Sequence, residues 1–155
     1  MAELRPGDKA PAFELPGNGG QKVSLSTYKG SPVVLFFYPK DDTSGCTIEN
    51  RDFTALADEF KKAGIVVIGM SPDSPNSHDK FTRKHGLDVV LASDEEKTTL
   101  EAYGVWKEKS MYGRKYMGVE RTTFLIDANG VVAKIWDKVK VAGHAEDVLK
   151  IAKEL

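Results

Sequence analysis

Two runs of consecutive apolar residues stand out in a chain that elsewhere mixes apolar and polar positions. Residues 33–38 read Val-Val-Leu-Phe-Phe-Tyr, and residues 65–70 read Ile-Val-Val-Ile-Gly-Met. Short continuous runs rich in β-branched and aromatic residues are typical of strands buried on both faces of a sheet. We therefore predict two central strands, the first of which ends at Pro39.

A helical pattern follows the first strand. Phe53, Leu56, Ala57 and Phe60 recur at the spacing of one helix face, and charged residues occupy the positions between them. This periodicity predicts one long amphipathic helix that packs its apolar stripe on the sheet. Gly64 is its natural end, because glycine readily adopts the left-handed conformation that closes helices.

The remaining segments predict shorter elements. They are a lead-in with strands at 12–15 and 23–25 around a turn at 17–20, a helix at 77–84 closed by Gly86, a strand at 89–91, a helix at 94–103, a hairpin of strands 122–126 and 131–136 with an Asn-Gly turn, and a final helix at 144–155. Strands that alternate with helices indicate a mixed sheet covered by helices on both faces. We predict an α/β fold in a single domain that spans residues 1–155.

Length and charge narrow the class of protein. A chain of 155 residues with 41% apolar residues is the size of one domain, and its 22 basic residues nearly cancel its 23 acidic ones. Such a balance predicts neither a nucleic-acid partner nor a membrane partner. The first residues lack the basic and then apolar pattern of a targeting signal, so we expect a cytoplasmic protein.

The chain has a single cysteine, Cys46. One cysteine excludes an intramolecular disulfide and a cysteine-rich zinc site. The three histidines, His78, His85 and His144, lie without ligand spacing, so we expect them to be structural or solvated and predict no metal and no cofactor. A lone cysteine fits a reducing compartment, where it is either an inert buried residue or a reactive nucleophile.

The position of Cys46 favours the nucleophile. It lies between the first central strand and the long helix, and Thr43 or Ser44 can serve as the N-cap of that helix. Cys46 then falls in the first turn, where free backbone N–H groups and the helix dipole stabilise a thiolate.

A reacting thiolate also needs hydrogen-bond donors where negative charge develops. The Thr43 hydroxyl and the N–H groups of Gly45 and Cys46 are candidate donors, and Pro39 can exclude water without adding a competing donor. A permanently charged donor is missing from this segment. A guanidinium would suit best, because it stays protonated and offers several N–H groups.

The pattern Pro39-x-x-x-Thr43-x-x-Cys46 resembles the active site of peroxiredoxins, and the surrounding run from Phe37 to Glu49 is similar to the bacterioferritin comigratory protein, or peroxiredoxin Q, subfamily. The resemblance continues through residues 7–13, 74–81, 107–113 and 118–126. It implies a thioredoxin-like fold and a thiol-dependent peroxidase that reduces hydrogen peroxide and organic hydroperoxides through a sulfenic acid on Cys46.

The resemblance also implies that Arg121 is the missing guanidinium, brought beside the thiol by the fold. Spacing in the sequence does not place these two residues together. For Glu49 two interpretations stay open. It positions Arg121 or a loop, or it is simply an acidic residue favoured in the first turn of a helix.

Two departures from the subfamily have consequences. Ser44 replaces the usual proline, which changes the stiffness of the loop more than its chemistry. The positions where relatives often carry a second, resolving cysteine are Arg51 and Thr82. We therefore expect a one-cysteine enzyme whose sulfenic acid is resolved by an external thiol: thioredoxin, glutaredoxin or a low-molecular-weight thiol. A monomer is favoured over a dimer.

Two other functions fit the sequence less well. A thiol-disulfide oxidoreductase usually carries Cys-x-x-Cys with the first cysteine attacking, but Thr43 occupies that first position. A non-enzymatic binding module or holdase with a silent thiol leaves the set of proline, threonine, cysteine and arginine unexplained. Trp106, Tyr112 and Trp136 are expected in the core or at a pocket rim, and residues 107–109 on a solvated face.

Overall fold

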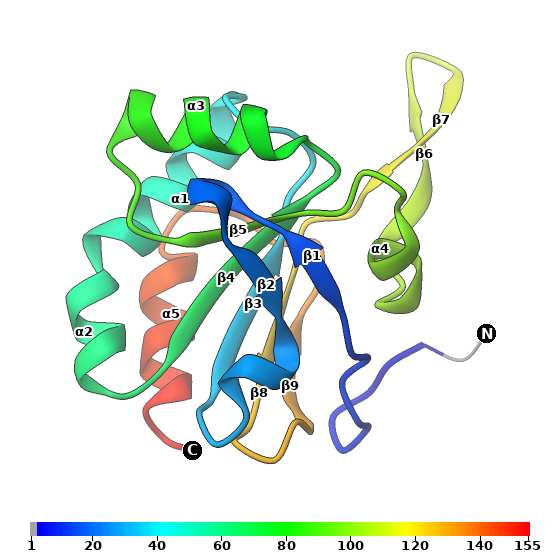
Figure 1. The fold of residues 1–155 in the computed structure, drawn as a ribbon. Helices are drawn as coiled ribbons and strands as arrows, with labels where there is room; N and C mark the ends of the chain where they lie inside the picture. The colour runs from blue at the N-terminus through cyan, green and yellow to red at the C-terminus, as the bar shows by residue number, and fades with distance from the viewer. Residues whose placement is uncertain (1–2) are drawn as a thin grey trace.

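A five-stranded mixed sheet forms the centre of the molecule in the computed structural model, which describes residues 3–155. In spatial order its strands are β5 (Val90–Ser93), β4 (Val66–Ser71), β3 (Val33–Phe37), β8 (Thr122–Ile126) and β9 (Val132–Trp136) (Figure 1). The first three are parallel, whereas β8 and β9 run antiparallel to their neighbours. The predicted mixed sheet is confirmed.

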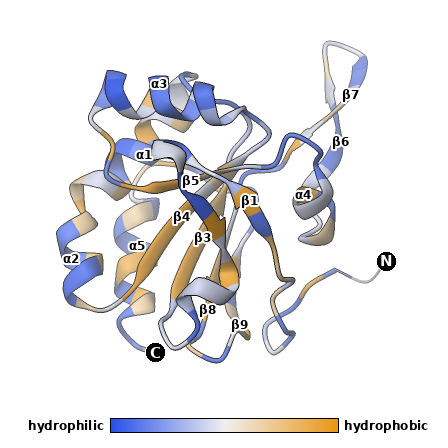
Figure 2. Cartoon of the chain, viewed as in Figure 1, coloured by the Kyte–Doolittle hydropathy of each residue, from blue (hydrophilic) through white to orange (hydrophobic). Residues whose placement is uncertain are grey.

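Strand β3 shows why the continuous apolar run belongs at the centre. All five of its residues are at most 2% exposed. Val33, Leu35 and Phe37 point to the hydrophobic cluster on one face of the sheet, and Val34 and Phe36 to the cluster on the other. Burial on both faces removes the need for alternating polar residues, and the central strands are accordingly among the most hydrophobic segments in Figure 2.

Helices cover both faces, as predicted. The helices α1 (Ser44–Ala55), α2 (Ala57–Lys62), α3 (Pro75–His85) and α5 (His144–Ala152) supply side chains to the cluster that contains Phe36. The opposite cluster is covered by α4 (Thr98–Ala102), β1 (Glu14–Pro16) and β2 (Lys22–Ser24). Strands β1 and β2 pair antiparallel, as the predicted lead-in requires, with the short 3₁₀ turns η1 (Asn18–Gly20) and η2 (Leu25–Tyr28) beside them.

The prediction of one long helix after β3 was wrong. The chain forms α1 and α2, separated at Leu56, whose φ of −99° and ψ of 5° leave the helical range. The Leu56 amide donates to the Phe53 carbonyl at 3.2 Å, which closes α1 with a tight turn before α2 begins. Phe53, Ala57 and Phe60 are still buried on the same face, so the apolar stripe survives the break.

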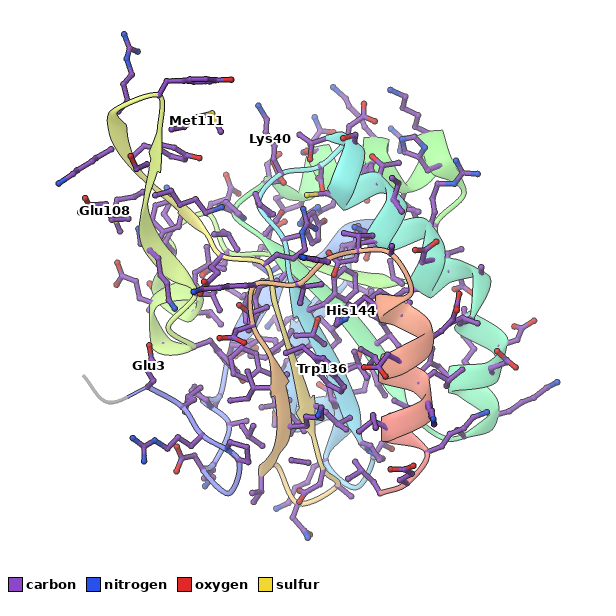
Figure 3. All side chains as sticks on the ribbon, turned by 180° about the vertical axis from the view of Figure 1, so that it is seen from behind. Glu3, Lys40, Glu108, Met111, Trp136 and His144 are labelled. Carbon is purple, nitrogen blue, oxygen red and sulfur yellow. The ribbon has the colours of Figure 1, made fainter. Side chains whose placement is uncertain are left out.

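The sequence did not reveal the hairpin of β6 (Trp106–Met111) and β7 (Arg114–Val119). Its two-residue turn, Tyr112-Gly113, has positive φ at both positions, 53° and 77°. Tyr112 is 98% exposed, so the prediction that it lies in the core or at a pocket rim was wrong. The hairpin projects from the body of the molecule in Figure 1, and Figure 3 shows Glu108 and Met111 along it.

Several predicted boundaries also shift. The helix expected at 94–103 spans only Thr98–Ala102, because the Asp94 carboxylate accepts the Leu100 amide at 2.7 Å instead of joining the helix. Helix α5 ends at Ala152 rather than at the last residue. Helix α3 begins earlier than expected, at Pro75, and ends at left-handed Gly86 as predicted. No helix within residues 3–155 is long and apolar enough to cross a membrane.

Candidate active site

The end of β3 delivers the chain to the start of α1. The Tyr38 amide still donates to the Met70 carbonyl at 3.0 Å, and Pro39, which has no N–H, then ends the pairing. Helix α1 begins at Ser44, and its first bonded amide is that of Thr47, which donates to the Thr43 carbonyl at 2.9 Å. Cys46 is therefore in the first turn, among amides without acceptors inside the helix.

The sulfur of Cys46 lies beside a guanidinium. Cys46 is 1% exposed, and Nη2 of Arg121 donates to its Sγ at 3.3 Å. Sheet register explains this meeting of residues far apart in sequence. Phe37 at the end of β3 pairs with Thr122 at the start of β8, so Arg121 lies at the same edge of the sheet as the loop before α1.

Glu49 holds the other side of the guanidinium. It follows Cys46 by almost one helical turn, and its Oε1 accepts from Nη1 of Arg121 at 2.6 Å. Its side chain is 1% exposed, and its second oxygen, Oε2, is buried without a hydrogen-bond partner. Burial raises the pKa of Glu49 to about 7, against the opposing effect of Arg121.

Arg121 remains a cation in this environment. Burial by itself would lower its pKa, but the Glu49 carboxylate and the Cys46 sulfur outweigh that effect and raise the pKa above its usual value. The backbone of Arg121 is also fixed, since its carbonyl accepts the Val139 amide at 3.0 Å. The guanidinium is thus a positioned and permanently charged donor to the sulfur.

Gly45 leaves the space that the guanidinium occupies. A Cβ at this position would lie 3.2 Å from Nη2 of Arg121, closer than ordinary contact. Its backbone lies within helix α1, so the lack of a side chain, rather than an unusual dihedral, is what matters at this position.

Thr43 occupies the N-cap position, as predicted, but its hydroxyl does not cap the helix. Instead the hydroxyl donates to the Lys40 carbonyl at 2.8 Å. Its proton is therefore not directed to the thiolate, which corrects the expectation of a donor there. The oxygen keeps lone pairs that can accept a hydrogen bond from an incoming O–H group. Pro39 is half-buried in the same loop.

A buried polar network anchors the loop, and sequence reasoning missed it. The carboxylate of Asp41 accepts from the Tyr38 hydroxyl at 2.6 Å, from the Ser77 hydroxyl at 2.8 Å and from Nδ1 of His78 at 2.7 Å. The other ring nitrogen of His78 faces the Ala92 carbonyl at 3.0 Å. Both ring nitrogens of His78 are therefore engaged with buried protein groups.

Asp73 joins this network from β4's end by accepting the Asp41 amide at 2.8 Å and the Ser71 hydroxyl at 2.7 Å. Asp41, Asp73 and His78 bring atoms of the ligand type within 4.8 Å of one another. However, these atoms already bond to protein donors and acceptors. In the sequence, this network was indicated only by Asp41 shortly after the first central strand, and by Ser77 and His78 in the segment 74–81 that resembles the peroxiredoxin Q subfamily.

The other two histidines are also engaged with protein groups. Nε2 of His85 lies 2.9 Å from the Asp42 carboxylate, and Nε2 of His144 lies 2.8 Å from the Thr123 hydroxyl. His144 packs edge-on against Trp136, and the two lie near each other in Figure 3. Burial lowers the pKa of His144 to about 4, so its ring is neutral at neutral pH.

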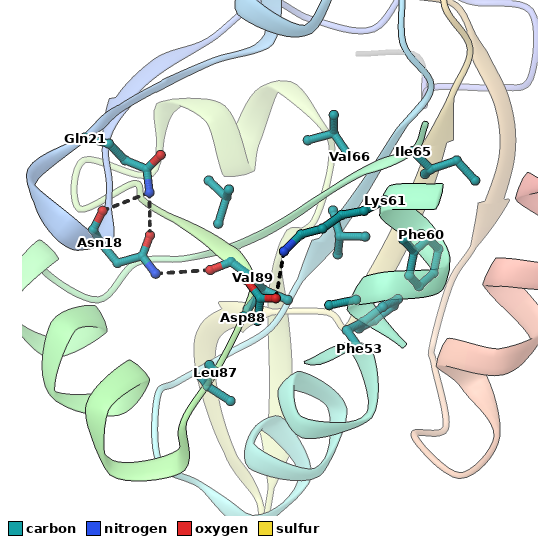
Figure 4. A pocket seen from close by; sticks show the side chains of 13 residues that line it. Asn18, Gln21, Phe53, Phe60, Lys61, Ile65, Val66, Leu87, Asp88 and Val89 are labelled. Atoms are coloured by element: carbon teal, nitrogen blue, oxygen red, sulfur yellow. Dashed lines mark hydrogen bonds and ion pairs between the residues drawn. The ribbon is translucent and has the colours of Figure 1, made fainter. Parts of the chain in front are cut away.

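A cavity between α2 and the β4–β5 edge is separate from the thiol (Figure 4). Leu87, Val89 and Phe60 form much of its apolar lining, and Lys61 and Asp88 form an ion pair at 2.8 Å beside it. Asn18 binds the backbone of Val89 and Leu91 there, which fixes η1 to the sheet. None of the groups at this cavity is a nucleophile.

The mixed sheet and the arginine-held cysteine at a helix start together define a class, the thiol peroxidases of thioredoxin-like fold. Comparison with known proteins makes this specific. The model of the AhpC/TSA family matches residues 6–135, and the chain belongs to this family.

Its relatives include several bacterial peroxiredoxins. The chain is 49% identical to a putative peroxiredoxin bcp of Coxiella burnetii, over 92% of this chain and 95% of that protein. It is 48% identical to peroxiredoxin Bcp of Bacillus subtilis, over 96% and 95% of the two chains. Among solved structures, the Xanthomonas campestris bacterioferritin comigratory protein aligns with a TM-score of 0.87 and 46% identity, over 92% of this chain and 90% of that one.

These findings show a thiol-dependent peroxidase, an enzyme that uses a peroxide substrate and a thiol reductant. The solved structures also show how this chain differs from a relative in its number of cysteines. Two solved structures of the Xanthomonas peroxiredoxin Q are cysteine-to-serine mutants at two different positions, so that relative has at least two cysteines. This chain has one.

Proposed function

We propose that Cys46 is the nucleophile of a one-cysteine peroxiredoxin that reduces hydrogen peroxide and organic hydroperoxides. The observation that carries the proposal is the 3.3 Å hydrogen bond from Nη2 of Arg121 to a sulfur placed in the first turn of α1. A cation and free helix amides at one sulfur favour the thiolate, which is the nucleophilic form.

In the first step the thiolate attacks the terminal oxygen of the peroxide. The S–O bond forms as the O–O bond breaks, Cys46 becomes a sulfenic acid, and the leaving alkoxide or hydroxide takes up a proton to become alcohol or water. Arg121 and the amides of Gly45 and Cys46 stabilise the charge that develops on the oxygens. Thr43 accepts the peroxide O–H, and Pro39 limits access of water.

In the second step an external thiol condenses with the sulfenic acid and releases water, and a second thiol then frees Cys46 by disulfide exchange. Internal resolution has no candidate, because Cys46 is the single cysteine of the sequence and neither Arg51 nor Thr82 carries a thiol. Thioredoxin, glutaredoxin and low-molecular-weight thiols remain the candidate reductants. The proposal takes the single domain 1–155 to act as a cytoplasmic monomer.

The test is peroxide consumption with and without added thiol. Without thiol, the reduced protein should consume one peroxide per chain, and a dione reagent should then label Cys46 as its sulfenic acid by mass spectrometry. With a dithiol present, consumption should continue over many turnovers. If Cys46→Ser consumes peroxide as fast as the parent, the proposal is rejected.

A further inference from the structure

Glu49 has a feature that positioning Arg121 does not explain. One of its oxygens binds the guanidinium, but Oε2 is buried and has no hydrogen-bond partner. An ionised carboxylate oxygen buried without donors is costly. A protonated oxygen at the same place is neutral and loses much less on burial.

The charge balance of the site also favours a protonated Glu49. The buried cluster contains one permanent cation, Arg121, and two groups that can be anions, the Cys46 sulfur and the Glu49 carboxylate. With both ionised, the cluster carries an uncompensated negative charge. One proton on Glu49 brings the cluster to neutrality while the sulfur remains a thiolate.

Among residues 3–155, Arg121 is the only cation that pairs with the Glu49 carboxylate. Asp52, on the same helix, adds a negative charge that raises the pKa of Glu49 further. From β6, Lys109 is a partly exposed cation whose pKa is lowered by burial and by Arg121, while Glu120 and the Cys46 sulfur oppose that shift. From α5, His144 is kept neutral by burial, and Arg121 also opposes its protonation. Burial raises the pKa of Glu49 to about 7, in agreement with the geometry.

We propose that Glu49 holds the proton that compensates the Cys46 thiolate and releases it when the sulfur is oxidised. This inference rests on the proposed function. It adds an exchangeable proton to the site and gives Glu49 a role beyond positioning Arg121.

The step balances in atoms and in charge. The thiolate and the peroxide give a sulfenic acid, which keeps the peroxide hydrogen, and an alkoxide or hydroxide. That anion gains one proton to become alcohol or water, and Glu49 loses one proton to become a carboxylate. The cluster is neutral before the step, as thiolate, guanidinium and carboxylic acid. It is neutral afterwards, as sulfenic acid, guanidinium and carboxylate.

Proton uptake from solution tests the inference. The reduced protein is mixed with one equivalent of hydrogen peroxide in weak buffer that contains a pH indicator, while thiolate loss is followed by ultraviolet absorbance. At about pH 6, where Glu49 is mostly protonated, uptake should be near zero per thiolate oxidised. At about pH 8, where Glu49 is mostly ionised, uptake should approach one proton.

The Glu49→Gln variant should take up about one proton per thiolate at both pH values, since glutamine has no proton to release. Its amide oxygen can still accept from Arg121, so the guanidinium keeps a partner. Glu59→Gln is the matched control, because it makes the same substitution at an exposed position of α2. It should behave like the parent.

Uptake of one proton by the parent at about pH 6 would overturn the inference, as would near-zero uptake by Glu49→Gln while thiolate is lost. If Glu49→Gln fails to fold, the parent protein alone tests the inference. Proton uptake that is the same at both pH values would contradict a proton donor that titrates between them. Absence of any thiolate loss on peroxide addition would instead reject the proposed function, and this inference with it.

Discussion

At the scale of single residues, Gly45 and Arg121 depend on each other. Glycine is the least helix-forming residue apart from proline, yet it occupies the first turn of α1. The reason is the guanidinium packed against its Cα, where a Cβ would approach Nη2 within 3.2 Å.

Replacement of Gly45 by alanine should therefore separate stability from activity. Alanine favours the helix by about 0.5–1 kcal/mol, so the urea midpoint should stay the same or rise. The added methyl group should push Nη2 away from the sulfur and slow peroxide-dependent loss of the thiol about tenfold, the effect of about 1.4 kcal/mol at the transition state. A variant that reacts at the parental rate would show that the close contact does not position Arg121.

Arg121→Lys tests the shape of the donor at constant charge. An ammonium cannot reach sulfur and Glu49 as a planar guanidinium does, so the peroxide step should slow about 100-fold while the fold is retained. Rapid-mixing measurement of thiol loss gives the rate, and circular dichroism checks the fold. Arg114→Lys, on the exposed hairpin, is the matched control and should leave the rate unchanged.

At the scale of elements, the loop between β3 and α1 is held by its neighbours. Asp41 receives three hydrogen bonds, two of them from residues of α3. This network connects the loop that carries the thiol to the helix on the far side of the site.

Asp41→Asn should destabilise the protein by about 1–3 kcal/mol, because an amide cannot accept all three buried hydrogen bonds that the carboxylate receives. Urea unfolding measures the loss. Asp42→Asn changes the neighbouring residue, whose carboxylate is exposed, and should lower the stability much less. Equal losses in the two variants would show that the buried hydrogen bonds of Asp41 do not stabilise the loop.

Elements with an apolar face were predictable, and elements without one were not. The runs at 33–38 and 65–70 identified β3 and β4 because burial on both faces leaves a continuous apolar signature. The β6–β7 hairpin has solvent on both sides for most of its length, so its residues carry no such alternation. Its Tyr112-Gly113 turn was the one available signal.

At the scale of the whole molecule, the residues of the site could be named from the sequence, but their contacts could not. Cys46, Thr43 and Pro39 lie in one short motif, whereas Arg121 meets the sulfur only through the pairing of β3 with β8. That pairing depends on tertiary packing, so only the resemblance to a family suggested Arg121. The direction of the Thr43 hydroxyl likewise depends on a carbonyl that the loop conformation presents.

Stability should respond to acid through His144. Its pKa of about 4 in the folded protein is below the ordinary value of 6.5, so the unfolded chain binds more protons between these pH values. His144 therefore contributes stability above about pH 6.5 that is lost as the pH falls toward about 4. His144→Gln should lack this loss.

The measurement is the difference in urea stability between the parent and His144→Gln as a function of pH. The raised pKa of Glu49 makes the stability of both proteins fall as the pH rises, which is opposite to the effect of His144. Subtracting the stability of one protein from that of the other removes this shared contribution. A difference that does not change between about pH 7 and about pH 4 would contradict the buried neutral ring.

The most direct test of the whole account is the rate at which Cys46 reacts with peroxide. Reduced protein is mixed with one equivalent of hydrogen peroxide at neutral pH, and titratable thiol is followed with Cys46→Ser as the blank. We expect loss of one thiol per chain at a rate at least about 100-fold above that of a free thiol, since an activated thiolate meets preorganised donors. A rate equal to that of a free thiol would contradict it.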